Sequence, residues 1–210
     1  MKRLVFLSAA IAALALASTA AAALAPWTFV GTGSSCPVVS TYDNGVLHLE
    51  KNCPTTTNAS AGASITGLDG QTFSSASFTL ASASQCQGGS PRFNVASSNG
   101  TTYFLGCNNV TPTTNADGTV TYTFTAATIA AAGNQVAFPS GAIKTVDVLI
   151  DVQGTADVSH ITVNGTTEVP VPTVTGPKHK SECKKGGWKT FTSPKFRNQG
   201  QCVSWSNHHR

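Results

Sequence analysis

The feature of this chain that most restricts its fold is a series of short segments in which apolar and polar residues alternate. Residues 119–125 alternate threonine with Val, Tyr and Phe, and residues 146–152 place Val, Val, Ile and Val on one face. Shorter stretches of the same pattern occupy 76–80 and 161–163, and the one short helical candidate is 126–133. A period of two is that of a half-buried strand, and short strands separated by turn residues are typical of antiparallel sandwiches and barrels. We therefore predict an all-β, antiparallel sandwich or barrel.

Composition excludes several other classes of protein. Charged residues make up 10% of the chain and hydrophobic residues 40%, whereas a disordered chain has few apolar residues and a high charge. The chain has one long apolar run, which argues against a polytopic membrane protein, and its 19 glycines and 10 prolines argue against a long coiled coil. The class that remains is a weakly charged, secreted β protein.

The N-terminus is typical of a secretory signal peptide. A basic pair, Lys2 and Arg3, precedes an apolar run over 4–16 and then a stretch of small residues. The run is about 13 residues long, shorter than the roughly 20 of a membrane-spanning helix, so we expect no transmembrane segment after processing. Two Ala-x-Ala sequences fit the cleavage pattern, and we prefer cleavage after Ala23. Residues 1–23 are then the signal peptide, and the protein is secreted and extracellular.

All six cysteines lie beyond this segment, at positions 36, 53, 86, 107, 183 and 202. An even number in an exported chain indicates disulfides, and no CxxC or Cys/His spacing indicates zinc. Asn44-Gly45 predicts a two-residue hairpin loop, because a type I′ turn needs a positive φ at both central positions. In a hairpin with that loop, the residue numbers of each facing pair add up to 89. Cys36 and Cys53 satisfy this condition, so they lie opposite each other and we expect them to be bonded.

The other two pairs follow less directly from the sequence. Asn99-Gly100 predicts a second two-residue hairpin loop, whose facing numbers sum to 199 and place Arg92 opposite Cys107. A bend at Gly88-Gly89 then brings Cys86 back toward Cys107, which makes Cys86–Cys107 the expected second pair. Cys183–Cys202 is left as the third.

Charge divides the chain after the signal peptide into two parts. Residues 24–175 contain three basic and eight acidic residues, a net charge of −5, whereas residues 176–210 contain eight basic residues and one acidic residue, a net charge of +7. The Thr-, Val- and Pro-rich sequence between them favours an extended linker. We assign residues 24–167 to a β-sandwich domain, 168–178 to the linker and 179–210 to a small, basic, disulfide-stapled C-terminal module.

Three stretches of the sandwich domain are distinctive: Cys86-Gln-Gly-Gly-Ser-Pro-Arg-Phe-Asn-Val95, Tyr103-Phe-Leu-Gly-Cys107, and 146–165 with its end Ile161-Thr-Val-Asn-Gly165. They resemble a group of uncharacterised secreted bacterial proteins that carry a GGSPRF motif. The resemblance covers about residues 30–166 and implies a jelly-roll-like β-sandwich of the kind seen in carbohydrate-binding modules. Related sequences often have acidic or amide residues where this chain has Ser159 and His160, which argues against a calcium site there.

The end of the chain carries a second resemblance. Its distinctive residues run from Cys183-Lys-Lys-Gly-Gly-Trp188 through Phe196-Arg-Asn-Gln-Gly-Gln-Cys202 to Trp205. They resemble a short C-terminal module that occurs on many exported bacterial proteins. The resemblance implies an extracellular location and no particular activity.

Arg92 is the candidate ligand-binding residue of the sandwich domain. It is one of three cations between residues 24 and 175 and lies in the GGSPRF motif. Its guanidinium binds either a ligand carboxylate or sugar hydroxyls, or else an acidic side chain of the domain itself, which locks the loop beside Cys86. The aromatic candidates for sugar stacking are Trp27, Tyr42, Tyr103 and Tyr122. The last two fall on core faces, so no exposed aromatic platform is evident.

The C-terminal module combines cations with aromatic rings, a pattern that binds anionic polymers by charge and by stacking. Its candidate binding residues are Lys184, Lys185, Trp188, Lys189, Lys195, Phe196, Arg197 and Trp205. The aromatic residues and one disulfide also suffice for the minimal core of so small a module, whose lysines then only keep it soluble. Both interpretations can hold together.

The sandwich domain offers little for catalysis or metal binding. The chain has no G-x-S-x-G, H-E-x-x-H or phosphate-loop motif, and His48 is a lone strand histidine. Asp147 and Asp151 lie about 13 Å apart along one strand, more than the roughly 5 to 10 Å between the two carboxylates of a glycosidase. The six aspartates of the domain lack calcium-binding spacing. We therefore expect no catalytic residue, metal or cofactor, and a structural calcium ion has no support.

These patterns indicate three functions, in order of preference. The first is a secreted, non-catalytic binding or cell-surface-associated protein whose basic tail engages an anionic cell-envelope polymer or polysaccharide. Nucleic acid is not expected as a partner in vivo, because the protein is exported. The second is a structural extracellular protein without a soluble ligand, and the third is a glycan hydrolase.

Overall fold

The computed structural model describes residues 23–133, 136–167, 169–170, 177, 179–189, 191 and 196–208. The predicted signal peptide, apart from Ala23, and most of the predicted linker lie outside these residues. Within the described part of the chain, no helix combines the length and the apolar character that crossing a bilayer requires.

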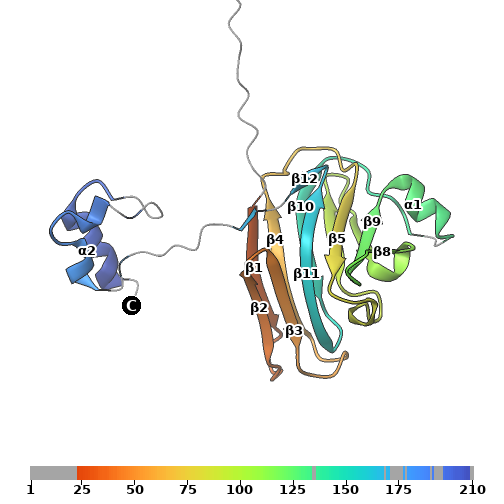
Figure 1. The fold of residues 1–210 in the computed structure, drawn as a ribbon, viewed down its shortest axis with the longest axis horizontal. Coiled ribbons are helices and arrows are strands. Elements are labelled where there is room, and N and C mark those ends of the chain that lie inside the picture. The colour runs from red at the N-terminus through yellow and green to blue at the C-terminus, as the bar shows by residue number, and fades with distance from the viewer. Residues whose placement is uncertain are drawn as a thin grey trace, which may run out of the picture.

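Two β-sheets form a sandwich, as the alternating pattern predicts (Figure 1). Sheet A has six strands, in the spatial order β13 (Val169–Pro170), β1 (Ala23–Val30), β4 (Ala59–Thr66), β10 (Ile143–Ile150), β6 (Arg92–Ser97) and β7 (Thr102–Gly106). Sheet B has seven strands, in the order β2 (Val38–Asp43), β3 (Val46–Lys51), β11 (Gly154–Val163), β5 (Ala76–Leu80), β9 (Val120–Phe124) and β8 (Thr113–Thr114), with β12 (Thr166–Thr167) also paired to β11. The one parallel pair among them is β1 with β13.

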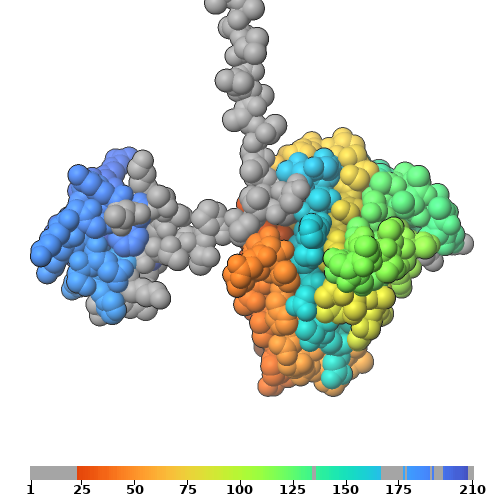
Figure 2. Space-filling view, viewed as in Figure 1, coloured from red at the N-terminus to blue at the C-terminus, as the bar shows by residue number. Residues whose placement is uncertain are grey.

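The long strand β11 lies at the centre of sheet B. Figure 2 shows it in cyan between the orange β2–β3 hairpin and the yellow β5, and the strand registers confirm both neighbours. Because β11 follows the centre strand β10 of sheet A, the chain crosses from one sheet to the other at residues 151–153. This crossing places Asp151 at the rim of the sandwich, next to both sheets.

The first hairpin has the predicted register. Asn44 and Gly45 have φ values of 49° and 83°, and Val38 faces Lys51, so the facing numbers sum to 89 as expected. Cys36 and Cys53 close the open end of this hairpin with a disulfide. The type I′ turn chemistry of Asn-Gly therefore fixes both the strand pairing and the position of the sulfur atoms.

The register predicted for the second hairpin is wrong by one residue. Arg92 faces Gly106 rather than Cys107. Of the two predicted loop residues only Gly100, at 84°, has a positive φ, and Ser97 donates its backbone N–H to the carbonyl of Thr101. The loop therefore has three residues with glycine in the left-handed position, a different hairpin class from the two-residue type I′ loop. Cys86 nevertheless bonds to Cys107, because Cys107 begins a short 3-10 turn (Cys107–Asn109) beyond β7.

The core between the sheets consists of the alternating apolar residues. Phe78 of β5 lies at its centre, with its ring centroid 5.4 Å from that of Phe93 on β6 and 5.7 Å from that of Phe124 on β9. Tyr103 and Tyr122 are also buried, as predicted from their strand faces. Because Phe93 belongs to sheet A and its partners to sheet B, this aromatic cluster joins the two sheets.

Helical structure is short and lies outside the sheets. Helix α1 (Ala126–Ala131) occupies the predicted helical segment and begins with a capping box, in which Thr125 and Thr128 each bond the other's backbone N–H. The sandwich also has a 3-10 turn at Ala83–Gln85. In the C-terminal module, 3-10 turns span Lys180–Cys183 and Gly187–Lys189, and helix α2 spans Gln199–His208. The third expected disulfide, Cys183–Cys202, joins the first of these turns to α2.

Candidate ligand-binding groove

The outer face of sheet A, which points away from the core, carries the candidate site. Strand registers align one row of outward residues across five strands: Trp27, Gly62, Leu149, Arg92 and Gly106. A second row, parallel to the first, contains Ser64, Asp147, Asn94 and Phe104. Since facing residues of neighbouring strands share one side of a sheet, these side chains form a continuous surface. We call this surface the sheet A groove.

Trp27 provides an aromatic platform in this groove. Its indole Nε1 donates a hydrogen bond of 3.3 Å to Asp147 Oδ1, which lies two strands away on β10. The ring therefore spans the intervening strand β4 above Gly62, where a Cβ atom would lie 2.8 Å from the indole. Leu149, beside the ring, is only 4% exposed although it faces away from the core. The indole thus crosses β4 and approaches the sheet at Gly62, and its side chain is half-buried.

Asp147 fixes the orientation of this platform. Its Oδ1 accepts the indole N–H and a second hydrogen bond of 2.6 Å from Ser64 Oγ. Its Oδ2 has no hydrogen-bond partner among the described residues. One carboxylate oxygen therefore positions the ring, and the other is an acceptor without a partner in the described part of the chain, on a residue that lines the groove.

Two adjoining hollows make up the floor of the groove. The first, of about 480 Å³, lies between Trp27, Phe29, the loop at residues 55–58 and the acidic pair Asp147 and Asp151. The second, of about 440 Å³, is lined by Gly88, Gly89, Phe104, Gly106 and Asn108. Arg92 lines both hollows, so its side chain marks the point where they meet.

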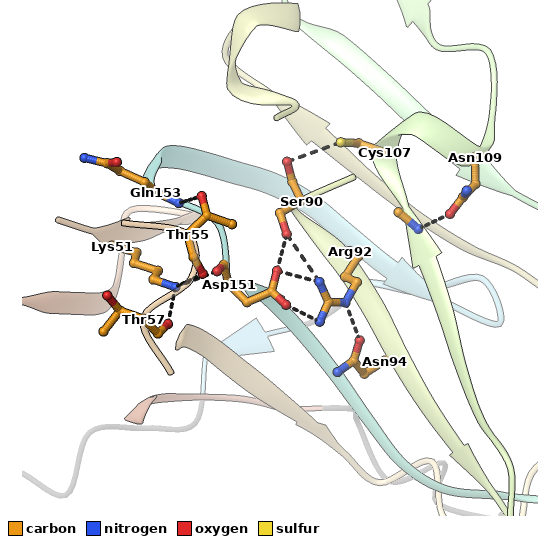
Figure 3. A network of polar contacts seen from close by, with 11 residues as sticks. Lys51, Thr55, Thr57, Ser90, Arg92, Asn94, Cys107, Asn109, Asp151 and Gln153 are labelled. Atoms are coloured by element: carbon orange, nitrogen blue, oxygen red, sulfur yellow. Dashed lines mark hydrogen bonds and ion pairs between the residues drawn. The ribbon is translucent and has the colours of Figure 1, made fainter. Parts of the chain in front are cut away.

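Arg92 forms the internal ion pair that was one of its two predicted roles. Its guanidinium donates two hydrogen bonds to Asp151, of 2.5 and 2.6 Å, and its Nε donates one of 2.9 Å to Asn94 (Figure 3). Ser90, also in the GGSPRF segment, donates a hydrogen bond of 2.8 Å to the same carboxylate. The motif therefore ties the entry of β6 to Asp151, and the guanidinium also lies over the Phe104 ring, 5.5 Å from its centroid.

These contacts keep Asp151 ionised. Burial by itself raises the pKa of the Asp151 carboxyl, but the hydrogen bonds from Arg92 and Ser90 and the charge of Arg92 outweigh it, so the pKa lies below its usual value. A general acid needs the opposite shift, toward the working pH. Asp151 is therefore built to hold a guanidinium rather than to transfer a proton.

Lys51 is a site residue that the sequence did not reveal. Its side chain is 0% exposed, and its Nζ donates hydrogen bonds to the backbone carbonyls of Thr55, Thr57 and Asp151, at 3.1, 2.8 and 2.7 Å (Figure 3). The ammonium thus ties the β3–β4 loop, which forms a wall of the groove, to the segment that carries Asp151. Nothing in the local sequence distinguishes this lysine from an exposed one at the end of a strand.

The C-terminal module uses its aromatic residues as a core. Cys183, Phe196 and Cys202 are buried, with Trp188, Phe191, Val203 and Trp205 packed around them. Phe196 meets the rings of Phe191 and Trp205 at centroid distances of 5.8 and 6.2 Å. Of the predicted binding aromatics, Phe196 is therefore only 5% exposed, and Trp188 and Trp205 are half-buried.

The cations of the module lie on its surface. Lys184, Lys185, Lys189 and Arg197 are exposed, and Lys189 Nζ lies 5.5 Å from the centroid of the Trp188 ring. Lys195 lies outside the described residues. The structure therefore brings charge to the surface of the module and directs most of the aromatic area inward.

Other candidate groups lie away from the groove. His48 contacts Asp157 at 2.7 Å and Glu50 at 3.8 Å on the outer face of sheet B. In the described parts of the chain, no group of three or more His, Cys, Asp or Glu side chains is placed to hold a metal ion. Comparison of the chain with models of known protein families, with curated proteins and with solved structures gave no match.

Proposed function

We propose that this is a secreted, non-catalytic binding protein that attaches to polysaccharide through the sheet A groove. The observation that carries the proposal is the indole of Trp27, which lines the first hollow and is held over Gly62 by the Asp147 carboxylate. A pyranose ring has an apolar C–H face and a rim of hydroxyl groups. The indole offers a matching apolar plane, and the free oxygen of Asp147 accepts a hydrogen bond at its edge.

Secretion is part of this proposal. The N-terminal sequence is typical of a signal peptide, and the three disulfides fit an oxidising compartment. Polysaccharides of the cell envelope are the ligands that an exported protein meets there. The likeness of the GGSPRF segment to secreted bacterial proteins with a sandwich of the carbohydrate-binding type points the same way.

The C-terminal module adds a second, electrostatic attachment in this proposal. Its exposed cations, among them Lys184, Lys185 and Arg197, give the tail its positive surface. Such a surface concentrates the protein at anionic envelope polymers, and salt weakens this attraction because the charges are exposed. Binding through the groove and binding through the tail can therefore be distinguished by varying the ionic strength.

A pull-down on insoluble neutral polysaccharides and on purified cell envelopes tests the proposal. The full-length mature protein, Trp27→Ala and the charge variant Lys184→Glu/Lys185→Glu are compared at low and high salt, with His48→Ala on sheet B as the control. We expect Trp27→Ala to lose retention on neutral polysaccharide at both salt concentrations. The charge variant should lose only the salt-sensitive retention on envelopes.

Two results would contradict the proposal. Retention of Trp27→Ala at the wild-type level would remove the groove from the binding site and leave the tail as the only anchor. The absence of retention of the wild type on every polymer would favour a structural extracellular protein. Release of reducing sugar by the wild type would instead support the glycan hydrolase.

A further inference from the structure

We infer that the sheet A groove binds an internal stretch of an uncharged polysaccharide chain, which lies across the strands from Trp27 on β1 to Phe104 on β7. This inference rests on the proposed function, and it names the ligand class and a second subsite. It follows from the exposure of Phe104, the distance between the two aromatic residues and the charge of the groove.

Phe104 provides the second aromatic surface. Its side chain is 53% exposed, the most exposed of the large apolar side chains in the described residues. The ring faces the second hollow, whose floor at Gly106 is bare backbone; a Cβ atom there would overlap the carbonyl oxygen of Gly89. The Arg92 guanidinium lies over the ring, 5.5 Å from its centroid, and limits the ring's movement. Phe104 is therefore an accessible surface at a defined position.

The separation of the two rings sets the length of the ligand. Strands β4, β10 and β6 lie between β1 and β7, so four inter-strand spacings of about 4.8 Å place these two strands about 19 Å apart. The Trp27 indole already reaches across β4 to Asp147 on β10, so two to three spacings, roughly 10 to 14 Å, separate it from β7. One sugar ring is too short to reach both surfaces, whereas an extended oligosaccharide that runs perpendicular to the strands touches both. The hollows meet at Arg92, so a chain can pass from one to the other.

The charges in the groove indicate an uncharged chain. The charged residues that line the two hollows are Arg92, Asp147 and Asp151. Arg92 and Asp151 neutralise each other through two hydrogen bonds. Asp147 then leaves one unbalanced negative charge beside the indole. This charge repels a uronic acid and accepts a hydrogen bond from a sugar hydroxyl.

A length series tests the inference on the full-length mature protein. The probes are cello- and laminari-oligosaccharides from the disaccharide to the hexasaccharide, titrated by calorimetry into the wild type, Phe104→Ala and Trp27→Ala. We expect the wild-type affinity to rise with length until the chain spans both rings and then to level off. Phe104→Ala should match the wild type with the shortest ligands and lose about tenfold in affinity with the longest, which corresponds to about 1.4 kcal/mol.

The controls separate the subsite from the groove itself. Because Phe104 is exposed, its truncation should leave the fold intact, and Val46→Ala on sheet B is the matched exposed control. An oligogalacturonate series of the same lengths should bind more weakly than the neutral sugars. A neutral ligand whose affinity depends on Trp27 but not on chain length would support the proposed function and overturn this inference.

Three further outcomes would also overturn it. The first is an equal or tighter affinity for the acidic series. The second is an affinity of Phe104→Ala that equals the wild-type value at every length. The third is binding of a proline-rich peptide at Trp27 in place of the sugars. If no oligosaccharide binds the wild type at any length, both this inference and the proposed function are wrong.

Discussion

Replacing Lys51 with methionine should destabilise the sandwich much more than the same replacement of an exposed lysine. The side chain is fully buried, and its ammonium has three backbone carbonyls as partners and no carboxylate partner among the residues that the structure describes. Methionine preserves most of the apolar stem and removes all three donors. The carbonyls of Thr55, Thr57 and Asp151 then lose the hydrogen bonds that the ammonium donates.

The expected loss is about 3 kcal/mol. A hydrogen bond from a charged donor contributes roughly 1.5 to 3 kcal/mol, and three of them set an upper range of roughly 4.5 to 9 kcal/mol. Two effects reduce this value. The ammonium no longer has to be desolvated, and water can reach the carbonyl of Thr55, whose residue is exposed. A loss of about 3 kcal/mol is a large part of the 5 to 15 kcal/mol that stabilises a typical domain.

Urea denaturation measures this change. With a slope of roughly 1 to 3 kcal/mol per molar urea, the midpoint of Lys51→Met should fall by about 1 to 3 M. Lys144→Met is the matched control, because Lys144 is the other lysine of the sandwich domain and is exposed; its change should stay within about 0.5 kcal/mol. Equal midpoints for the two variants would refute the role of Lys51 in holding the groove wall.

Three further predictions concern the ion pair, the module and the platform. The pKa of Asp151 lies below the ordinary 3.8 in the folded protein, so its charge stabilises the fold above that pH and the contribution disappears as the pH falls further. Asp151→Asn should therefore have a lower melting temperature than the wild type at pH 7. In a series of thermal melts, its melting temperature should also fall less steeply than that of the wild type as the pH is lowered. Cys183→Ser/Cys202→Ser removes a crosslink between residues 19 apart, worth about 3 kcal/mol; amide NMR should show an unfolded module and an unchanged sandwich. Gly62→Ala should cost about 1 to 3 kcal/mol and displace the Trp27 indole, detected as altered fluorescence and lost polysaccharide retention.

The sequence predicted the features of the fold that depend on local chemistry. Alternation identified the strands and the buried faces of Tyr103 and Tyr122, and Asn44-Gly45 determined the first hairpin and with it the Cys36–Cys53 bond. The second hairpin shows the limit of this reasoning. Asn-Gly is compatible with a two-residue loop and with a three-residue loop, and at Asn99-Gly100 the chain forms the three-residue loop.

The groove could not be predicted, because it depends on which strands become neighbours. Trp27 is positioned by Gly62 and Asp147, which lie 35 and 120 residues away in the sequence. Its position across β4 follows from the order β1-β4-β10, which no local pattern specifies. The Arg92–Asp151 pair was among the expected outcomes, since one of only three cations in an acidic domain favours an internal partner. The identity of the acidic partner, Asp151, could be determined only from the structure.

The burial of Lys51 also determines where amine chemistry can reach this protein. The sandwich domain has two lysines, Lys51 and Lys144, whereas residues 176–210 contain six. Lys51 is inaccessible to an acylating reagent, so labelling should occur at the tail, Lys144 and the amino terminus. Coupling the protein to an activated bead or sensor chip would therefore attach it mainly through the tail. The sheet A groove would remain open, which makes the native chain suitable for immobilised glycan screening without an added tag.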